Sequence, residues 1–338
     1  MPRSTSFAFR ILAVLAAAGC LRLCGCGKGE DPSSVPRPPP TDADGFTLMT
    51  YNLCRYGLQD RDNDGQKNDP KPGNERKALI SIIRKANPDV LAVQEIGNVT
   101  FFEEFRFSLQ EAGLVYPHTE YLQRGRSEVN MAVLSRFPIV ARQSHTDDQY
   151  SIGSAEIAVG RGFIDLEIEV HPAYRFRLMT AHLKSKVFHS LGQTEMRRNE
   201  ARLLNNHVRK ALKENPELNL VVVGDFNDSP NSAAFRELAG DKQKYLLDIR
   251  PVDRERSAWT FFDSTQDIYS RIDYILVSHG MRPEAIPEKS YAMNDPLLFE
   301  ASDHRPIVAA FRSRETAPSE TPPIVEKPKV SPGNGEDL

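Results

Sequence analysis

Short apolar segments, separated by polar and turn-forming residues, recur through the middle of the chain. A segment of about four to eight residues that alternates apolar and polar side chains, or is apolar throughout, predicts a β-strand. Val90–Val93 is apolar throughout, as in a strand that is buried on both faces. Strands are expected at Phe46–Leu53, Val90–Val93, Met131–Leu134, Phe163–Val170, Arg175–Leu183, Leu220–Val223, Tyr274–Val277 and Ile307–Phe311.

Apolar residues at helical spacing occur in only three places. They predict helices at residues 78–86, at Phe101–Leu109 and at Glu195–Leu212. Many strands with few interspersed helices indicate an α/β sandwich of mixed or antiparallel sheets, rather than a regular repeat of strand and helix.

The two ends of the chain differ from the middle in composition. Residues 27–45 and 315–338 each contain five prolines and few apolar side chains. Such segments cannot bury enough apolar surface to offset the entropy that is lost on ordering. We therefore expect a disordered proline-rich linker at 27–45 and a disordered tail at 315–338. The remaining residues, 46–314, are enough for one domain with a single well-buried core.

Residues 1–26 have the pattern of an export signal. Arg3 and Arg10 precede an apolar run, Ile11–Gly19, which is too short to span a bilayer. The small residues of this run lead into Cys20, and Cys26 follows, so the segment predicts a bacterial lipoprotein signal in which one of these cysteines is lipidated. An ordinary cleaved signal peptide is the alternative. Both interpretations export the domain to the cell envelope, and the first anchors it to a membrane, in the periplasm or at the cell surface.

Charge and composition exclude several classes of protein. The 338 residues carry 43 basic and 46 acidic side chains, and the expected domain has a net charge of −1. A strong global positive field for nucleic acid is therefore excluded, although local basic patches are not. The chain has no apolar run long enough for a multi-pass membrane protein. Cys54 is the only cysteine in the expected domain, which excludes an internal disulfide there.

Polar residues with chemical capability stand where the expected strands begin or end. Taken singly, each is more simply interpreted as a turn former, a solvated acid or a structural histidine. Together, their carboxylate and amide oxygens suit a hard divalent cation, and their imidazoles suit proton transfer near neutral pH. This combination is what the hydrolysis of a phosphate ester requires. The residues are Asn52, Glu95, His182, Asp225, Asn227, Asp303 and His304.

At these positions the chain resembles the endonuclease/exonuclease/phosphatase superfamily, whose members are deoxyribonuclease I-like. The resemblance rests on seven motifs that occur in the family's order across nearly all of residues 46–314. The motifs are Thr50-Tyr51-Asn52, Val93-Gln94-Glu95, residues 132–139, residues 181–185, Gly224-Asp225-Phe226-Asn227-Asp228, Arg271-Ile272-Asp273-Tyr274 and Ser302-Asp303-His304-Arg305-Pro306. At position 182 the chain resembles the deoxyribonuclease I, sphingomyelinase and inositol-phosphatase branches, which have histidine there. Abasic-site repair members usually have tyrosine at this position.

The resemblance implies a fold and a metal site. The fold is α/β (α+β), a four-layer αββα sandwich of two mixed β-sheets, with the site where the loops of the two sheets meet. Glu95 would be the principal ligand of Mg²⁺, or of Mn²⁺ in its place. Asn52 and Asp303 would complete or support the metal shell.

The resemblance also implies catalytic roles. Asp225 would orient or deprotonate the attacking water, and Asn227 would donate to the phosphoryl oxygens. His304, oriented by Asp273, would act in acid–base chemistry or contact the phosphate. His182 would be the second catalytic histidine or a phosphate donor. Arg161 is a further candidate for contact with the phosphate.

The loop after Asn52 contains a second candidate metal site. Asp60, Asp62, Asp64 and Asn68 occupy positions 1, 3, 5 and 9 of a calcium-binding loop. The twelfth position, normally a glutamate, is Lys71. An acidic turn in a solvated loop is the alternative, and the sequence leaves both open.

The sequence therefore predicts a metal-dependent phosphoesterase that acts as a monomer. An exported nuclease or other phosphodiesterase, with nucleic acid or another phosphodiester as substrate, is the leading hypothesis. A near-neutral domain predicts modest, salt-sensitive affinity for DNA. A phosphatase or phospholipase acting on sugar, inositol or lipid phosphates is the first alternative, although no segment stands out as an aromatic hairpin for membrane insertion. A non-catalytic surface protein with the same fold is the second.

Overall fold

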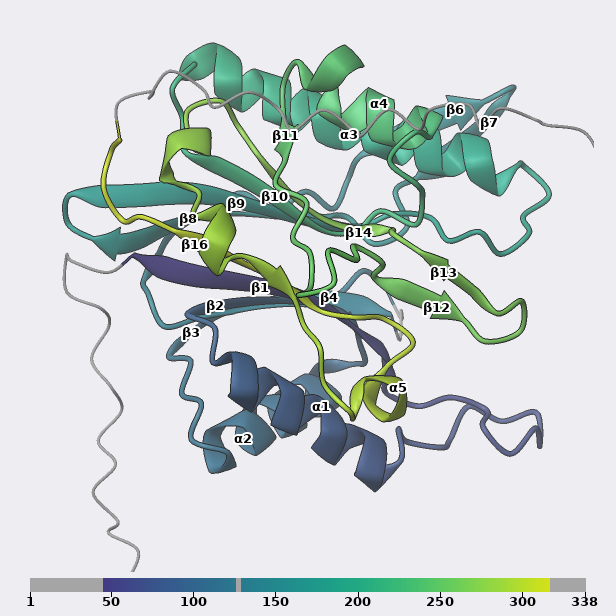
Figure 1. Cartoon of the computed structure of the whole chain (residues 1–338). Coiled ribbons are helices and arrows are strands. Elements are labelled where there is room, and N and C mark those ends of the chain that lie inside the picture. Colours follow the sequence, from purple (N-terminus) through teal and green to yellow (C-terminus); the bar gives the residue numbers. More distant parts are fainter. Residues whose placement is uncertain (1–44, 126–128, 317–338) are drawn as a thin grey trace, which may run out of the picture. The chain divides into compact units, whose positions relative to one another are not determined.

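Two stacked six-stranded sheets contain most of the strands in a computed structural model of the protein, which describes residues 45–125 and 129–316 (Figure 1). The described residues belong to one unit of the chain, Pro38–Leu338. The expected export signal, most of the expected linker and most of the expected tail lie outside the described residues. The predicted boundaries of these segments stay predictions.

The first sheet is mixed. Its strands β1 and β2 run parallel, and its other neighbouring pairs are antiparallel. In spatial order its strands are β15 (Tyr291–Ala292), β16 (Ile307–Phe311), β1 (Phe46–Tyr56), β2 (Val90–Ile96), β4 (Asn130–Ser135) and β3 (His118–Leu122).

The second sheet is mixed in the same way. Its only parallel pair is β9 with β10. In spatial order its strands are β11 (Leu247–Asp248), β14 (Asp273–Val277), β10 (Leu220–Asp225), β9 (Tyr174–His182), β8 (Phe163–His171) and β5 (Ile139–Arg142). Two separate hairpins pair β6 (Gln149–Ile152) with β7 (Ala155–Ala158) and β12 (Phe261–Asp263) with β13 (Ile268–Ser270).

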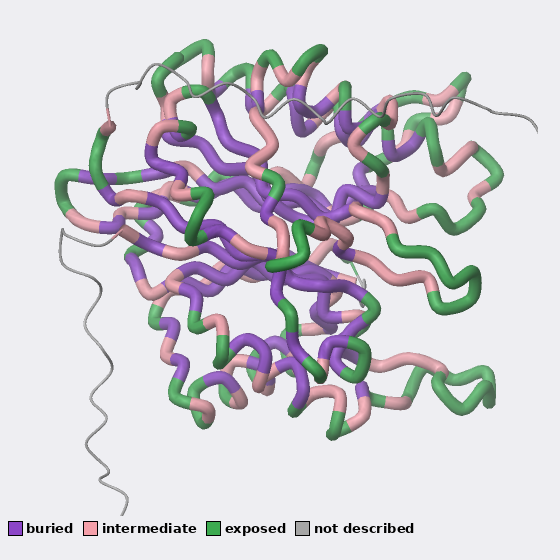
Figure 2. The backbone as a smooth tube through the Cα atoms, viewed as in Figure 1, coloured by how far each residue is buried: buried purple, intermediate pink, exposed green. Residues whose placement is uncertain are grey.

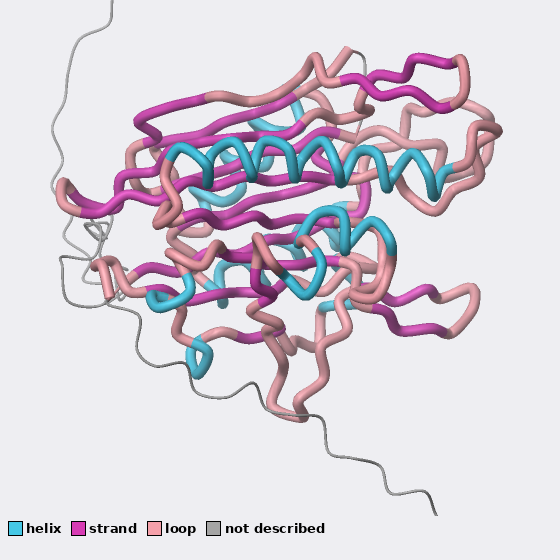
Figure 3. The backbone as a smooth tube through the Cα atoms, turned by 90° about the horizontal axis from the view of Figure 1, so that it is seen from above, coloured by secondary structure: helices cyan, strands magenta, loops and turns pink. Residues whose placement is uncertain are grey.

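Helices cover the outer face of each sheet, which makes four layers (Figure 1). Helices α1 (Gly73–Ala86) and α2 (Val99–Glu111) pack on the first sheet, and α3 (Gln193–Glu214) and α4 (Ala233–Ala239) pack on the second. Figure 3 shows α3 running along the strands beneath it. Shorter helical turns are α5 (Leu298–Ala301), Asp241–Gln243, Arg282–Glu284 and Pro287–Lys289. None of the helices in the described part of the chain has the length and apolar character needed to cross a membrane.

The period-two side-chain pattern explains the layering. In β10, Val221 and Val223 point into the core between the sheets, whereas Leu220 and Val222 point toward α3 and α4. Strands of this kind are buried on both faces, as Figure 2 shows for the middle of the sandwich. Continuous apolar sequence is therefore required, as the sequence analysis inferred for Val90–Val93.

The predicted fold is confirmed. Each strand and helix that the sequence analysis expected is present, with its ends shifted by a few residues. The elements that it missed are short, and include α4, the two hairpins and the edge strands β3, β5, β11 and β15. Edge strands bury only one side and carry weak apolar patterns; β3, for example, is half-buried along most of its length.

Candidate active site

Three predicted site residues lie side by side at the end of the second sheet because of its strand register. Asp225, the last residue of β10, pairs with His182 at the end of β9 and with Asp273 at the start of β14. Residues that pair across neighbouring strands point to the same face of a sheet. All three side chains are buried.

Gly224 allows β10 to approach β9 closely at this point. Its φ is +132°, and a Cβ atom there would lie 2.0 Å from the carbonyl oxygen of Ala181. Any larger residue would push the two strands apart and separate Asp225 from His182. The glycine is therefore part of what holds the site together.

The first sheet contributes Asn52 and Glu95 through an irregular ending of β1 and β2. The two strands pair as far as Asn52 and Gln94, and their register then shifts. Cys54, Arg55 and Glu95 have positive φ values of 48°, 56° and 62°, which non-glycine residues rarely adopt. This backbone turns the Arg55 N–H toward Glu95, where it donates to Oε2 at 2.9 Å.

Asn52 joins the two sheets. Its Nδ2 donates to Glu95 Oε1 at 3.3 Å and to Asp225 Oδ2 at 3.1 Å, while its Oδ1 accepts from the Cys54 N–H at 3.0 Å. Asn227 holds the other oxygen of Asp225, because its backbone N–H donates to Oδ1 at 2.8 Å. The Asn227 side chain donates to the Leu183 carbonyl at 3.0 Å.

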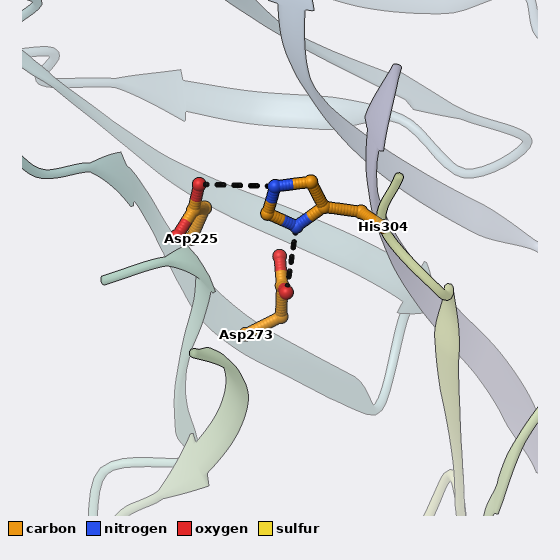
Figure 4. A group of neighbouring side chains, drawn as sticks. All are labelled: Asp225, Asp273 and His304. Atoms are coloured by element: carbon orange, nitrogen blue, oxygen red, sulfur yellow. Dashed lines mark hydrogen bonds and ion pairs between the residues drawn. The ribbon is translucent and has the colours of Figure 1, made fainter. Parts of the chain in front are cut away.

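His304 lies between two carboxylates (Figure 4). Its Nδ1 is 2.9 Å from Asp273 Oδ2, and its Nε2 is 3.8 Å from Asp225 Oδ2. Thr260 fixes the backbone of Asp273, since its hydroxyl accepts the Asp273 N–H at 3.0 Å. The Ser302 hydroxyl accepts the His304 N–H at 3.0 Å and donates to the Asn52 carbonyl at 2.9 Å.

The Nε2 atom of His182 lies close to two carboxylates, those of Asp225 and Glu95, whereas its Nδ1 has no partner. Its Nε2 is 3.3 Å from Asp225 Oδ2, and its buried Nδ1 has no hydrogen-bond partner. Burial, together with the positive charges of Arg161 and His304, holds the pKa of His182 well below its ordinary value. The lowered pKa favours the neutral imidazole, so the contact with Asp225 is not that of a charged ion pair.

The pKa values of Asp225 and His304 are both raised above their ordinary values. Burial, reinforced by the charge of Asp273, raises the pKa of Asp225 to about 7. Burial lowers the pKa of His304, but the Asp273 and Asp225 carboxylates outweigh it and raise the pKa to about 10. Burial and the charge of Asp273 thus favour the protonated form of Asp225, whereas the two carboxylates favour the charged form of the His304 imidazole.

Asp303 lies at the rim of the site rather than within the buried network. It is exposed, and its Oδ1 accepts a hydrogen bond from the Ser302 hydroxyl at 3.4 Å. Burial raises the pKa of the Cys54 thiol to about 12, and the charges of Asp303 and Glu95 contribute to the rise. Seven of the eight predicted site residues are thus linked by direct contacts, and the eighth is adjacent.

The donor set at the mouth of the site fits a hard divalent cation. Glu95 keeps 18% of its side chain exposed and Asp303 is exposed, so both offer carboxylate oxygens where water has access, while the buried Asn52 holds Glu95 through its Nδ2. Asp225, Asp273 and His304 also place ligand atoms within 4.8 Å of one another. These three are buried and already contact one another.

Glu200 is a supporting residue that the sequence analysis missed. Its buried carboxylate accepts the Lys184 N–H at 2.6 Å and the Gly160 N–H at 3.4 Å, next to the carbonyls of His182 and Leu183 that Arg161 binds. Burial raises its pKa. The position of Glu200 on the apolar face of the predicted helix at Glu195–Leu212 could have identified it as a buried acid.

The predicted calcium loop gathers three of its four carboxylate and amide residues. Asp60, Asp62 and Asp64 place one oxygen each within 4.8 Å of the others, and Asn68 is exposed. Lys71, at the position of the usual glutamate, is buried and binds the Cys54 carbonyl at 3.1 Å and Glu75 at 3.0 Å. Calcium binding here stays a prediction.

An aromatic hairpin borders the site. The β12–β13 hairpin beside His304 carries Tyr269 with 51% of its surface exposed. The side chain faces outward because β13 is a short strand of a separate two-stranded ribbon, with no sheet covering it. That no aromatic hairpin serves for membrane insertion stays a prediction.

Two stacked mixed sheets that hold carboxylates, amides and imidazoles together at one end define a deoxyribonuclease I-like phosphoesterase fold. The chain belongs to the Endonuclease/Exonuclease/phosphatase family, whose sequence pattern matches residues 49–304. This family hydrolyses phosphate esters, commonly with divalent metals. No curated protein matches the chain at a significant level.

Solved structures with the same fold come from several kinds of protein. Truncated Caenorhabditis elegans TDP2 has a TM-score of 0.52 at 17% identity, covering 79% of this chain and 96% of its own. The human Nocturnin catalytic domain has a TM-score of 0.56 at 19% identity, covering 81% and 99%. Sphingomyelinase C from Streptomyces griseocarneus has a TM-score of 0.54 at 16% identity, covering 79% and 99%. At these identities the likeness establishes the fold.

Proposed function

We propose that the protein is a metal-dependent phosphodiesterase, an exported nuclease that hydrolyses phosphodiester bonds by attack of water. The observation that carries this proposal is the unbroken chain of contacts from Glu95 through Asn52 to Asp225, and from Asp225 to His304 and Asp273. It supports a cation held by oxygen ligands beside a carboxylate and an imidazolium that exchange protons.

Glu95, Asn52 and Asp303 are the residues that would hold Mg²⁺, or Mn²⁺ in its place. The bound cation would neutralise the charge that builds on the phosphoryl oxygens. Glu95 is suited to the role because the Arg55 N–H and the Asn52 amide fix both of its oxygens.

Asp225 is the residue placed to position and deprotonate the attacking water. Its pKa of about 7 matches the working range of a general base near neutral pH. Asn52 and Asn227 fix both of its oxygens, so its orientation is set before a substrate arrives.

His304 is the proton donor to the leaving oxygen in this proposal. Asp273 holds its Nδ1, which leaves Nε2 free to point toward the Asp225 side of the site. The neutral His182 supplies a hydrogen bond rather than a charge, and Arg161, held by the His182 and Leu183 carbonyls, supplies positive charge nearby.

Export and a lipid anchor rest on the pattern of residues 1–26. The nuclease assignment rests on the family and on the loop sequence Asp225-Phe226-Asn227-Asp228-Ser229-Pro230, which is similar to exported bacterial nucleases. A phosphatase or a phospholipase would use the same catalytic residues.

The test is an assay with Mg²⁺ on four substrates: plasmid DNA, RNA, sphingomyelin and inositol phosphates. His304→Ala is compared with His279→Ala, because His279 is an exposed histidine outside the site. We expect turnover of nucleic acid by the parent and by His279→Ala, and a loss of about 10²- to 10⁴-fold in His304→Ala. Turnover of only the lipid or only the phosphomonoesters would replace the nuclease assignment. Turnover of none would refute the enzyme.

A further inference from the structure

Four aromatic rings form a connected surface beside the site, which we call the aromatic array: Trp259, Phe262, Tyr269 and Phe299. Trp259 is stacked on Phe299 with ring centroids 5.9 Å apart and planes 5° apart, and Phe262 is stacked on Tyr269 at 4.5 Å. Edge contacts of 4.9 Å between Trp259 and Tyr269 and of 5.4 Å between Phe262 and Phe299 close the group. Each ring thus touches two others.

The array is attached to the catalytic loop. The Phe262 N–H donates to the Asp303 carbonyl at 2.9 Å, and the ring of Phe261 lies 4.9 Å from that of His304. Phe262 and Tyr269 are directly paired across the β12–β13 hairpin, so their rings share the face opposite to Phe261. The array therefore lies at the border of the site, on the face of the hairpin opposite to Phe261 and His304.

The array is rigid and yet open to solvent. The Arg305 guanidinium lies 4.6 Å from the Trp259 ring, and it is fixed by the Met293 carbonyl at 2.5 Å and by Asp253 at 2.8 Å. In contrast, 51% of Tyr269 and 60% of Phe299 are exposed. Exposed, flat ring faces suit a planar ligand that stacks on them. Flexible alkyl chains would gain little from the same flat surface.

The rings of the array are uncharged, and charges of both signs border them. Asp263 and Asp267 lie in the hairpin and Glu300 follows Phe299, whereas the Arg305 guanidinium packs on Trp259. Arg161 and Lys184 supply positive charge on the His182 side of the site, where a phosphate would be attracted. A ligand with its phosphate in the site and an uncharged planar group beside it meets both halves of this surface.

We propose that the aromatic array stacks an unpaired nucleobase next to the scissile phosphate, so that the preferred substrate is single-stranded nucleic acid. The proposal rests on the proposed nuclease function and adds the state of its substrate. A paired base already stacks within its duplex and would have to be pulled out to reach Tyr269 and Phe299, whereas a single strand presents its bases freely.

The fluorescence of Trp259 tests the proposal without turnover, because Trp259 is the only tryptophan in the chain. The full protein in EDTA is titrated with a single-stranded oligodeoxynucleotide, an oligoribonucleotide, an abasic oligomer of equal length, a duplex and phosphatidylcholine vesicles. We expect the fluorescence to respond to the two base-containing single strands and to respond weakly to the other three. The relative affinities of the two single strands assign the substrate as DNA or RNA.

Tyr269→Ala and Phe299→Ala are the variants, and Phe107→Ala is their matched control, since Phe107 is 61% exposed on α2. Each array variant is expected to bind the single strands roughly 5- to 150-fold more weakly, and the control is expected to bind them unchanged. An equal response to the abasic oligomer, a response to vesicles only, or unchanged binding by both variants would overturn the proposal. Stacking without any later turnover in Mg²⁺ would instead refute the proposed function and leave the array's role intact.

Discussion

His304 and Asp273 join the two sheets through a 2.9 Å contact between Nδ1 and Oδ2. His304 comes from the loop before β16 of the first sheet, and Asp273 is the first residue of β14 in the second. The position of the His304 imidazole is therefore set by the stacking of the two sheets and not by local sequence. This relationship makes the site sensitive to changes in either sheet.

Asp273→Asn is predicted to lower kcat by about 10²- to 10⁴-fold, since the imidazole loses its orienting carboxylate. Asp273 raises the pKa of His304, so its replacement lowers that pKa and moves the basic limb of the pH–rate profile to lower pH. The measurement is kcat across pH, with the exposed Asp241→Asn as control. A basic limb that stays in place would show that His304 is not the acid.

Gly224→Ala is predicted to destabilise the fold by roughly 2–4 kcal/mol, because the new Cβ would lie 2.0 Å from the Ala181 carbonyl oxygen at a φ of +132°. Gly73→Ala is the matched control, since open space surrounds a Cβ at that position. Denaturant unfolding measures both free energies. Equal stability of the two variants would contradict the close approach of β10 and β9.

Asp165→Asn is predicted to cost about 3–5 kcal/mol at neutral pH, because it leaves the half-buried Arg177 without its carboxylate partner at 2.6 Å. Burial alone would raise the pKa of Asp165, but hydrogen bonds from Arg177 and His145 hold it below 3.8. The stabilisation is thus present above pH 3.8 and is lost as the pH falls through the lower pKa of the folded state.

Urea unfolding of the parent and of Asp165→Asn between neutral and acidic pH measures this difference. The gap between the two proteins should narrow as the pH falls below 3.8. A gap that is independent of pH would mean that the carboxylate charge at this position does not stabilise the fold.

Glu200→Gln is predicted to lower kcat without lowering the stability of the fold. The amide keeps the shape of the side chain but weakens its acceptance of the Lys184 and Gly160 N–H groups, which hold the loop after His182. We expect a fall of roughly tenfold in kcat at a nearly unchanged melting temperature. A fall in melting temperature that accounts for all of the lost activity would assign Glu200 to stability alone.

The sequence predicted the sandwich fold and the identity of the site residues. It predicted the distances and contacts between those residues less well. A strand such as β10 can be recognised from sequence because it is buried on both faces and must therefore be apolar throughout. Asn52 and Asp225 were recognisable as strand-end residues, but their direct contact depends on how the sheets stack. That stacking is decided by side chains distributed over the whole core.

The aromatic array shows what local pattern alone could not reveal. Tyr269 lies in a three-residue strand, and Phe299 lies in a four-residue helical turn, so neither had a periodic signal. Their proximity to Trp259 arises only when the hairpin and α5 fold against the same loop. The exposure of the two rings is likewise a property of the tertiary structure.

The dependence of phosphodiester hydrolysis on a divalent cation and on Glu95 tests the central claim most directly. Nucleic acid turnover is measured in EDTA and across a Mg²⁺ titration for the parent, for Glu95→Gln and for the matched, exposed Glu111→Gln on α2. We predict no turnover in EDTA, recovery with Mg²⁺ in the parent and in Glu111→Gln, and a shift to roughly 10- to 100-fold higher Mg²⁺ in Glu95→Gln. Full turnover in EDTA, or a Glu95→Gln titration that matches the parent, would contradict the account.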